Sequence, residues 1–311
     1  MPRLMLALNA RRRGLTLPEL LVAMLLLAIV GGGVTRVMMK QQQYYKDASK
    51  TAGAKRELRL GASVLPSEFR SVSSSGGDIL AMSESEIIMR SYIGTSIVCA
   101  LSGNDISVPP RNLARHTLTS YVTLPAVGDT VFVFNENFER GSQDDQWEKR
   151  TIVSMDLSNS DCSGPPFTDP ILDPPAAKGR RRYRLDTPLP PEVQVGAVVR
   201  FTRPVSYQIY QGTSGAWYLG LDAYSGGSWG GPSPLAGPYQ AFASGDTNPS
   251  GLQFRYFDSL GVRITNMANR NDVARVDVSL RTDAGASAIT ERKGSALRDS
   301  VLMRIAIRNF K

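Results

Sequence analysis

The pattern of apolar and polar residues changes character along the chain. Residues 15–30 form an almost unbroken apolar run, and beyond Val34 apolar residues alternate with Lys and Arg as far as residue 70. This pattern predicts one long helix that is apolar on all sides in its first half and amphipathic in its second. The apolar face of the second half would pack on a head, and residues 71–78 have a loop composition that ends the helix.

Three consecutive glycines, Gly31, Gly32 and Gly33, interrupt the apolar run near the middle of the predicted helix. Each glycine costs about 1 kcal/mol relative to alanine in a helix interior. We therefore expect a local kink or a melted turn near these residues.

Short runs with strand-like alternation follow the helix, and loop-like segments separate them. They lie at residues 86–93, 96–99, 130–134, 147–153, 181–185, 197–201, 205–210, 216–221, 251–257, 273–281 and 301–309. The runs at 205–210 and 216–221 have the spacing of a hairpin, and the last three runs would close an antiparallel sheet. The predicted fold class is α+β, with a long N-terminal helix packed on an antiparallel β-sheet head at residues 71–311.

Residues from about 100 to 202 have the character of a small β subdomain inserted into the head. Two of its predicted strands share a Val-Gly-x-x-Val lead-in, at Val127 and Val195. A basic cluster at residues 179–182 lies between them. The cluster favours a solvated hairpin, and contact with nucleic acid or lipid is the alternative.

Net charge bears on whether the protein binds nucleic acid, and the cysteines bear on the compartment in which it folds. The chain has 311 residues and a formal net charge of +8, and Arg3, Arg11, Arg12 and Arg13 supply four of these charges. The remainder is only weakly basic, so net charge gives no ground for nucleic-acid binding. The two cysteines, Cys99 and Cys162, favour one disulfide outside the cytoplasm, which would contribute roughly 4 kcal/mol; two unrelated buried thiols are the alternative.

Residue patterns that carry enzyme chemistry are missing from the sequence. There is no phosphate-binding glycine loop, no zinc-binding His-Glu-x-x-His and no Gly-x-Ser-x-Gly elbow, and the single histidine is His116. Acidic clusters at residues 144–145 and 156–161 lack the spacing of an EF-hand calcium loop. We therefore expect a protein that is not an enzyme and has no catalytic residue, metal site or cofactor.

Glu19 is the one carboxylate inside the apolar run. Placing an ionised carboxylate in a bilayer costs roughly 2.5 to 3.5 kcal/mol on insertion scales, so such a group usually has a partner. A secretory signal peptide would end in an Ala-x-Ala-like site, which the residues after Val30 fit poorly. A plain membrane anchor explains the length of the run but leaves Glu19 unexplained. A buried core helix would show a polar stripe, which is missing between Leu20 and Val30.

The segment Gly14-Leu15-Thr16-Leu17-Pro18-Glu19-Leu20 resembles the type IV prepilin signature, in which a basic leader ends in glycine and Glu is the fifth mature residue. The family more often has Phe at the position of Leu15 and Ile at that of Pro18. The resemblance implies a leader at residues 1–14, a helix at 15–70, cleavage by a prepilin peptidase between Gly14 and Leu15, and N-methylation of Leu15. It further implies that Glu19 pairs with the free N-terminal amine of a neighbouring subunit during assembly.

The predicted strands near Tyr207, Leu252, Val276 and Ile305 resemble those of PilW-type minor pilins and J-type pseudopilins. This resemblance implies a subunit at or near the tip of a type IV pilus or type II secretion pseudopilus, supporting pilus assembly, adhesion, motility, DNA uptake or secretion. Its partners would be prepilin peptidase, other major and minor pilins or pseudopilins, and the bacterial inner membrane, which one helix would span with the head extracytoplasmic. The alternative is a membrane-tethered extracytoplasmic hydrolase or binding protein.

Overall fold

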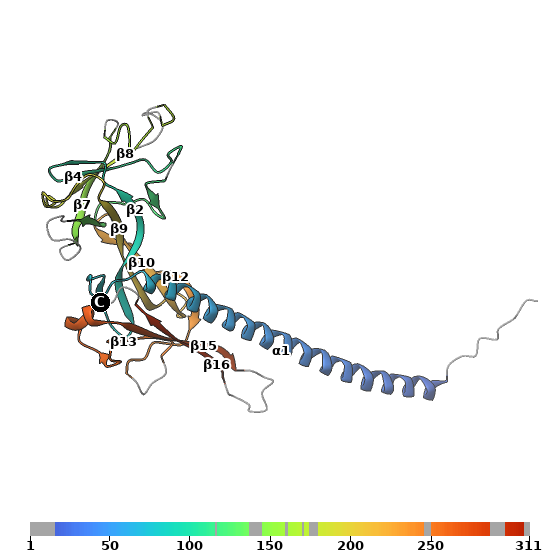
Figure 1. The fold of residues 1–311 in the computed structure, drawn as a ribbon. Coiled ribbons are helices and arrows are strands. Elements are labelled where there is room, and N and C mark those ends of the chain that lie inside the picture. Colours follow the sequence, from blue (N-terminus) through green and yellow to red (C-terminus); the bar gives the residue numbers. More distant parts are fainter. Residues whose placement is uncertain are drawn as a thin grey trace, which may run out of the picture. The chain divides into compact units, whose positions relative to one another are not determined.

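The computed structural model describes residues 16–115, 117–136, 145–158, 161–169, 171–173, 180–245, 250–286 and 296–307. Contacts divide the chain into two units, Met1–Gly53 with Ala284–Leu297 and Ala54–Asp283 with Arg298–Lys311. A helix of 54 residues, α1 (Leu17–Arg70), precedes all the strands (Figure 1). A long apolar N-terminal helix followed by an antiparallel β-sheet domain confirms the predicted α+β class.

The helix α1 runs without interruption through Gly31, Gly32 and Gly33, so the expected melted turn is wrong. The cost of three glycines is spread over a helix of 54 residues, whose hydrogen bonds continue on both sides of them. The hydroxyl of Thr35 also donates to the carbonyl oxygen of Gly31 at 2.8 Å. Helix propensity alone therefore does not break the helix at this point.

Most strands of the second unit belong to one large antiparallel sheet. They are β1 (Ile79–Met82), β2 (Glu86–Ile97), β3 (Ala100–Ser102), β4 (Asp105–Val108), β5 (Ser120–Tyr121), β6 (Thr130–Asn135), β7 (Gln146–Ser158), β8 (Arg180–Leu185), β9 (Val198–Gln211), β10 (Trp217–Ser225), β11 (Ser228–Trp229) and β12 (Ser233–Tyr239). The main path of the sheet is β1-β2-β9-β6-β7-β8-β4-β3, and β10 joins it by pairing with β9. The predicted hairpin at residues 205–221 is confirmed as β9 and β10.

The long strands β2 and β9 pair along almost their whole length (Figure 1). The sequence predicted two shorter strands in place of each, which is wrong. In β2 a register shift between Tyr92 and Gly94 lets the strand continue past the expected break. In β9, Pro204 lies between the segment that pairs with β6 and the segment that pairs with β10. Neither β6 nor β10 pairs with Pro204, which lies opposite Arg90 of β2 on the other side of the strand, so a residue without an N–H is tolerated at this change of neighbour.

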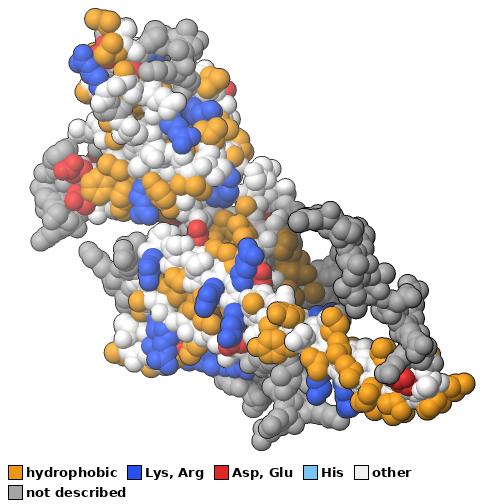
Figure 2. All heavy atoms as spheres, turned by 90° about the vertical axis from the view of Figure 1, so that its right-hand side faces the viewer, with side chains coloured by type: hydrophobic (Ala, Val, Ile, Leu, Met, Phe, Trp, Pro, Cys, Tyr) orange, Lys and Arg blue, Asp and Glu red, His pale blue; other side chains and the backbone are white. Residues whose placement is uncertain are grey.

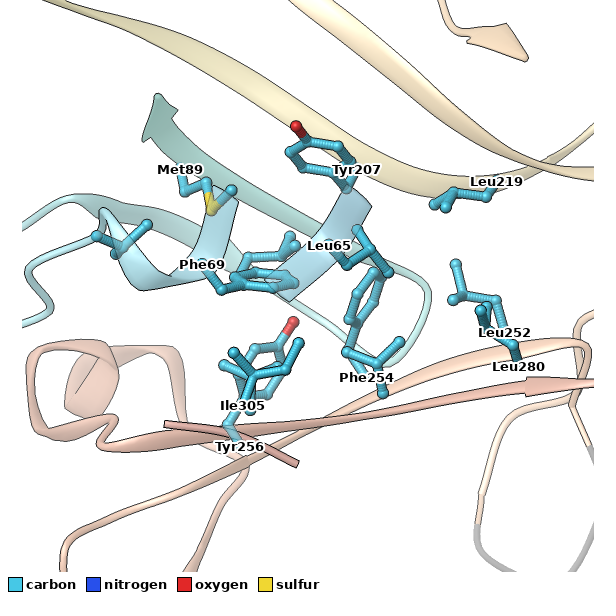
Figure 3. Packing of buried hydrophobic residues seen from close by; sticks show 14 of the residues in the cluster. Leu65, Phe69, Met89, Tyr207, Leu219, Leu252, Phe254, Tyr256, Leu280 and Ile305 are labelled. Atoms are coloured by element: carbon cyan, nitrogen blue, oxygen red, sulfur yellow. The ribbon is translucent and has the colours of Figure 1, made fainter. Parts of the chain in front are cut away.

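A first hydrophobic core lies between the end of α1 and the strands that follow (Figure 3). From the helix it takes Leu58, Leu65 and Phe69, all of which are buried. The ring of Phe69 packs 6.4 Å from that of Tyr207 on β9 and 6.3 Å from that of Phe254. The apolar face of the last turns of α1 therefore packs on the sheet.

A second, four-stranded sheet contributes to the first core. It consists of β13 (Leu252–Phe257), β14 (Arg263–Ile264), β15 (Arg275–Ala286) and β16 (Ala296–Ala306), in the order β14-β13-β15-β16, with a short 3-10 helix, η2 (Met267–Asp272), after β14. The three predicted closing strands are thus confirmed as β13, β15 and β16, although β16 begins earlier than expected.

A second hydrophobic core lies within residues 93–201. At its centre the ring of Tyr183 lies 5.1 Å from that of Phe201, and the ring of Tyr121 lies 5.5 Å from it. The buried members are Ile93, Val98, Ile106, Val108, Tyr121, Val131, Val133, Ile152, Tyr183, Leu185, Val193, Val199 and Phe201. Since β2 and β9 take part in both cores, this region is continuous with the rest of the sheet.

Candidate functional site in the N-terminal helix

The first turn of α1 carries Glu19 three residues after Thr16. The hydroxyl of Thr16 donates to the Glu19 carboxylate at 3.5 Å, and the Leu20 N–H donates to the carbonyl oxygen of Thr16 at 3.1 Å. This spacing is that of a helix capping box, and a carboxylate in the first turn interacts favourably with the helix dipole. Pro18 lies in the same turn, where its missing N–H has no intrahelical acceptor to lose. Gly14 and Leu15, the predicted cleavage and methylation residues, lie outside the described residues.

The surface of the helix after Glu19 is apolar and exposed. Residues 17–34 are all exposed, and no Asp, Glu, Lys or Arg lies between Glu19 and Arg36. The most apolar window has a mean hydropathy of 2.2 and none of its residues is buried. By length and composition this helix can cross a membrane. Figure 2 shows hydrophobic side chains covering the exposed end of the helix.

Basic and aromatic residues follow the apolar segment. Arg36, Lys40 and Lys46 lie on the next turns, together with Tyr44 and Tyr45, whose rings meet edge to face at 6.2 Å. Tyrosines and long basic side chains are enriched where membrane helices leave the hydrocarbon layer. The charge distribution of α1 therefore indicates a membrane boundary near these residues.

The two cysteines are brought together by the fold. Cys99 and Cys162 form a disulfide with Cα atoms 5.2 Å apart, and both residues are buried. The bridge closes a segment with a sequence separation of 63 and ties the loop after β7 to the start of β3.

One ion pair joins the acidic and basic clusters among the described residues, and a second lies beside it on β8. Arg182 donates to Asp161 at 2.7 Å, and Arg184 donates to Asp105 at 2.9 Å, which lowers the pKa of the Asp105 carboxyl. Among the described residues no group of three or more His, Cys, Asp and Glu could hold a metal ion. His116 and Asp144 lie outside this part of the chain.

Sequence reasoning missed a patch of aromatic and cationic side chains on the outward face of β6, β7 and β9. Its members include Phe134, Trp147 and Arg200, which are far apart in the sequence. The only signal was the alternation in residues 130–134, which places Phe132 and Phe134 on the face opposite the valines. Which strand lies beside them depends on the sheet order, which the sequence did not provide.

Comparison with known proteins adds one finding at this end of the chain. Residues 9–35 match the model of the prokaryotic N-terminal methylation motif. The matched segment contains Gly14, Leu15 and Glu19 and the apolar beginning of α1. The match supports a type IV pilin-like protein, and together with the apolar helix it is consistent with membrane anchoring. No curated protein and no solved structure matches the chain.

Proposed function

We propose that this protein is a minor pilin or pseudopilin, made as a precursor and assembled at or near the tip of a type IV pilus or type II secretion pseudopilus. The observation that carries the proposal is the methylation motif at residues 9–35 on a helix whose exposed apolar surface bears a single carboxylate, Glu19. Minor subunits of the PilW and J types are the proposed subtype, on the resemblance of the strands near Tyr207, Leu252, Val276 and Ile305.

Gly14 and Leu15, which lie outside the described part of the chain, would be the sites at which the precursor is processed before assembly. A prepilin peptidase hydrolyses the peptide bond between Gly14 and Leu15, which removes the basic leader and frees the amine of Leu15. A methyltransferase then moves a methyl group from a methylsulfonium donor to the amine, which loses one proton as the donor leaves as a thioether. Before hydrolysis this amine is part of a peptide bond and has no charge, so a precursor cannot present it to a neighbour.

Glu19 would then act as the pairing residue during assembly. In a filament the helix is surrounded by other apolar helices, where an unpaired carboxylate is costly. The positive amine of Leu15 on a neighbouring subunit offsets this cost, and removing one partner of such a pair leaves the other charge uncompensated. The pairing therefore favours a subunit that enters the filament at the correct axial position.

The proposed location follows from the same segment. The apolar part of α1 spans the bacterial inner membrane once, with the leader on the cytoplasmic side and the head outside the cytoplasm. The disulfide between Cys99 and Cys162 supports an oxidising compartment for the head. The partners are prepilin peptidase and other pilins or pseudopilins, which meet the helix in the membrane.

The role proposed here is structural and not enzymatic. The competing candidate is a membrane-tethered hydrolase or binding protein whose anchor only resembles a prepilin leader. Such a protein would not depend on Glu19 for its position, so the carboxylate separates the two candidates.

Replacing Glu19 by glutamine tests the proposal, because the variant keeps the shape of the side chain and removes its charge. We expect normal processing of Glu19→Gln in cells with an active prepilin peptidase and at least a tenfold loss of the subunit from sheared filaments. The measurement is immunoblotting of the filament and membrane fractions.

The matched control is Asp47→Asn, which removes a carboxylate from the same helix beyond the apolar segment. This control should enter filaments at the level of the wild-type chain. Incorporation of Glu19→Gln at the wild-type level would overturn the pairing role.

A further inference from the structure

The outward face of β2, β9, β6 and β7 carries two rows of side chains opposite the second core. Val133 and Val199 point into that core, so their neighbours along each strand point away from it. The second row, in register across the four strands, is Thr95, Arg200, Phe132 and Lys149. The first row lies beside it, with Ile97 opposite Val198 and Phe134 opposite Trp147. An apolar and aromatic row thus lies beside a row with two cations.

The aromatic row is open to solvent at Trp147, which is 41% exposed, and at Val198, which is 43% exposed. The Trp147 ring lies 5.2 Å from that of Phe134, and the guanidinium carbon of Arg200 lies 5.6 Å from the Trp147 ring centroid. Phe134 and Val198 also line a hollow together with Val195 and Glu136. A large indole held in place on an exposed sheet face offers a rigid surface for stacking.

The two cations of the second row are Arg200 and Lys149. No ion pair joins Arg200 or Lys149 to an acidic residue in the part of the chain that the structure describes. The nearby Glu148 points to the other side of β7 and pairs with Arg150 at 3.2 Å. Burial lowers the pKa of Lys149, and the charges of Arg90 and Arg270 lower it further.

The carboxylate of Asp78, on which both of these cations act, is buried. Asp78 is 6% exposed and accepts a hydrogen bond from the Ser73 N–H at 2.9 Å. The charges of Arg90, Arg200 and Lys149 all act on it. A ligand of opposite charge would relieve the repulsion that Arg90 and Arg270 exert on Lys149.

We propose that this face binds a single-stranded nucleic acid, whose bases stack on Trp147 and Phe134 while Arg200 and Lys149 contact the phosphates. Stacking aromatic residues beside a basic groove is the combination by which sheet surfaces hold single strands without reading their sequence. Glu136 at one end of the face repels phosphate and limits the path of the strand to the region of the two cations. The inference is independent of the pairing role of Glu19 and goes beyond it.

Fluorescence anisotropy of a labelled oligothymidylate of about 20 nucleotides, titrated with the full-length chain in detergent, tests the proposal. We expect binding that weakens between about 50 and 200 mM salt. Trp147→Ala should weaken binding by at least about fivefold, because one stacked base is lost. Arg200→Gln and Lys149→Gln should each reduce the steepness of the logarithmic salt dependence by about 0.7.

Two matched controls come from the same chain. Trp229→Ala removes a tryptophan with the same 41% exposure on another hairpin, and Arg111→Gln removes an exposed cation elsewhere in the head. Both controls should bind like the wild-type chain. Near-ultraviolet circular dichroism verifies that each variant is folded, and Trp147→Phe should retain most of the affinity if stacking is the contact.

Three results would overturn the proposal. The first is no detectable binding of the oligonucleotide at low salt by the folded wild-type chain. The second is equal weakening by Trp147→Ala and Trp229→Ala. The third is displacement of the oligonucleotide by a sulfated polysaccharide whose own binding is lost in Trp147→Ala, which would assign the face to a polysaccharide.

Discussion

Asp78 is a residue whose protonation contributes to the stability of the head. Burial raises the pKa of its carboxyl above the usual value, although the hydrogen bond from Ser73 and the charge of Arg90 oppose the shift. The native state therefore binds the proton more tightly than the unfolded chain does. The stabilisation from protonation is fully present below the unfolded pKa and is lost as pH rises through the folded pKa.

We predict that the stability difference between the wild-type chain and Asp78→Asn depends on pH. As pH falls from about 7 to 4, the wild-type chain should gain free energy of unfolding relative to the variant, because only the wild type takes up the proton. Urea denaturation at several pH values measures the difference. The control Asp272→Asn changes an exposed carboxylate, and a difference for Asp78→Asn that is independent of pH would contradict the account.

Gly61 is the residue at which α1 approaches the sheet most closely among its described glycines. A Cβ atom there would lie 2.6 Å from the Tyr239 hydroxyl oxygen and 2.8 Å from a methyl carbon of Leu280. Gly53 lies earlier in the same helix and is the last helix residue of the first unit. A Cβ atom at Gly53 would meet no heavy atom within 4 Å. The two glycines thus have the same backbone role and different surroundings.

Substitution by alanine should change the free energy of unfolding in opposite directions at Gly61 and Gly53. Gly61→Ala should destabilise the head by about 1 to 3 kcal/mol through overpacking, partly offset by helix propensity. Gly53→Ala should be neutral or stabilising by up to about 1 kcal/mol. Chemical denaturation of both variants gives the comparison, and a Gly61→Ala chain as stable as Gly53→Ala would show that the helix does not pack there.

At the scale of elements, the disulfide ties the loop after β7 to the start of β3. Cys99 and Cys162 close a segment with a sequence separation of 63, and cross-links of this length contribute about 4 kcal/mol in the chain-entropy model. Reductant should therefore lower the thermal midpoint of the wild-type chain and leave that of a Cys99→Ser/Cys162→Ser variant unchanged. Equal midpoints of the wild type with and without reductant would argue against a stabilising bridge.

The sequence predicted elements whose pattern is local and missed those that depend on their neighbours. The helix α1 and the closing strands β13 and β15 were predictable because their apolar spacing is regular. The strand β12 was missed because Pro234 and Pro238 suggested a loop, yet β12 pairs with β10 and prolines are tolerated at a sheet edge. The continuity of β9 through Pro204 was missed for the related reason that its neighbours change there.

The two candidate sites also differ in how far the sequence could predict them. Glu19 was predictable because a carboxylate in an apolar run stands out in the sequence, and the structure adds its hydrogen bond from Thr16. The pairing of Trp147 with Phe134 and Arg200 was not predictable, since it depends on the order and register of three strands. Periodicity places a side chain on a face of a strand but does not say which strand lies beside it.

At the scale of the whole molecule, one chain combines an apolar helix suited to lipid with a folded β-rich head. The first part is long and apolar enough to cross a membrane, and an exposed apolar surface of this kind marks a site of contact with lipid or protein. The head has two hydrophobic cores of its own. Our account links these parts through a change at the N-terminus, where removal of the leader creates the amine that Glu19 of another subunit would contact.

Blocking the removal of the leader should leave the chain in the membrane. We predict that Gly14→Ala accumulates as an unprocessed precursor that sediments with membranes and requires detergent for extraction, because the apolar helix is unchanged. Sheared filaments should contain none of it. A Gly14→Ala chain found in filaments at the wild-type level would mean that assembly does not need the new amine.

The most direct test of the central claim is the mass of the N-terminal peptide of the wild-type chain, isolated from cells with an active prepilin peptidase. The account predicts a mature protein that begins at Leu15 and carries one methyl group on its amine. A mature protein that still begins at Met1 or Pro2 would contradict it.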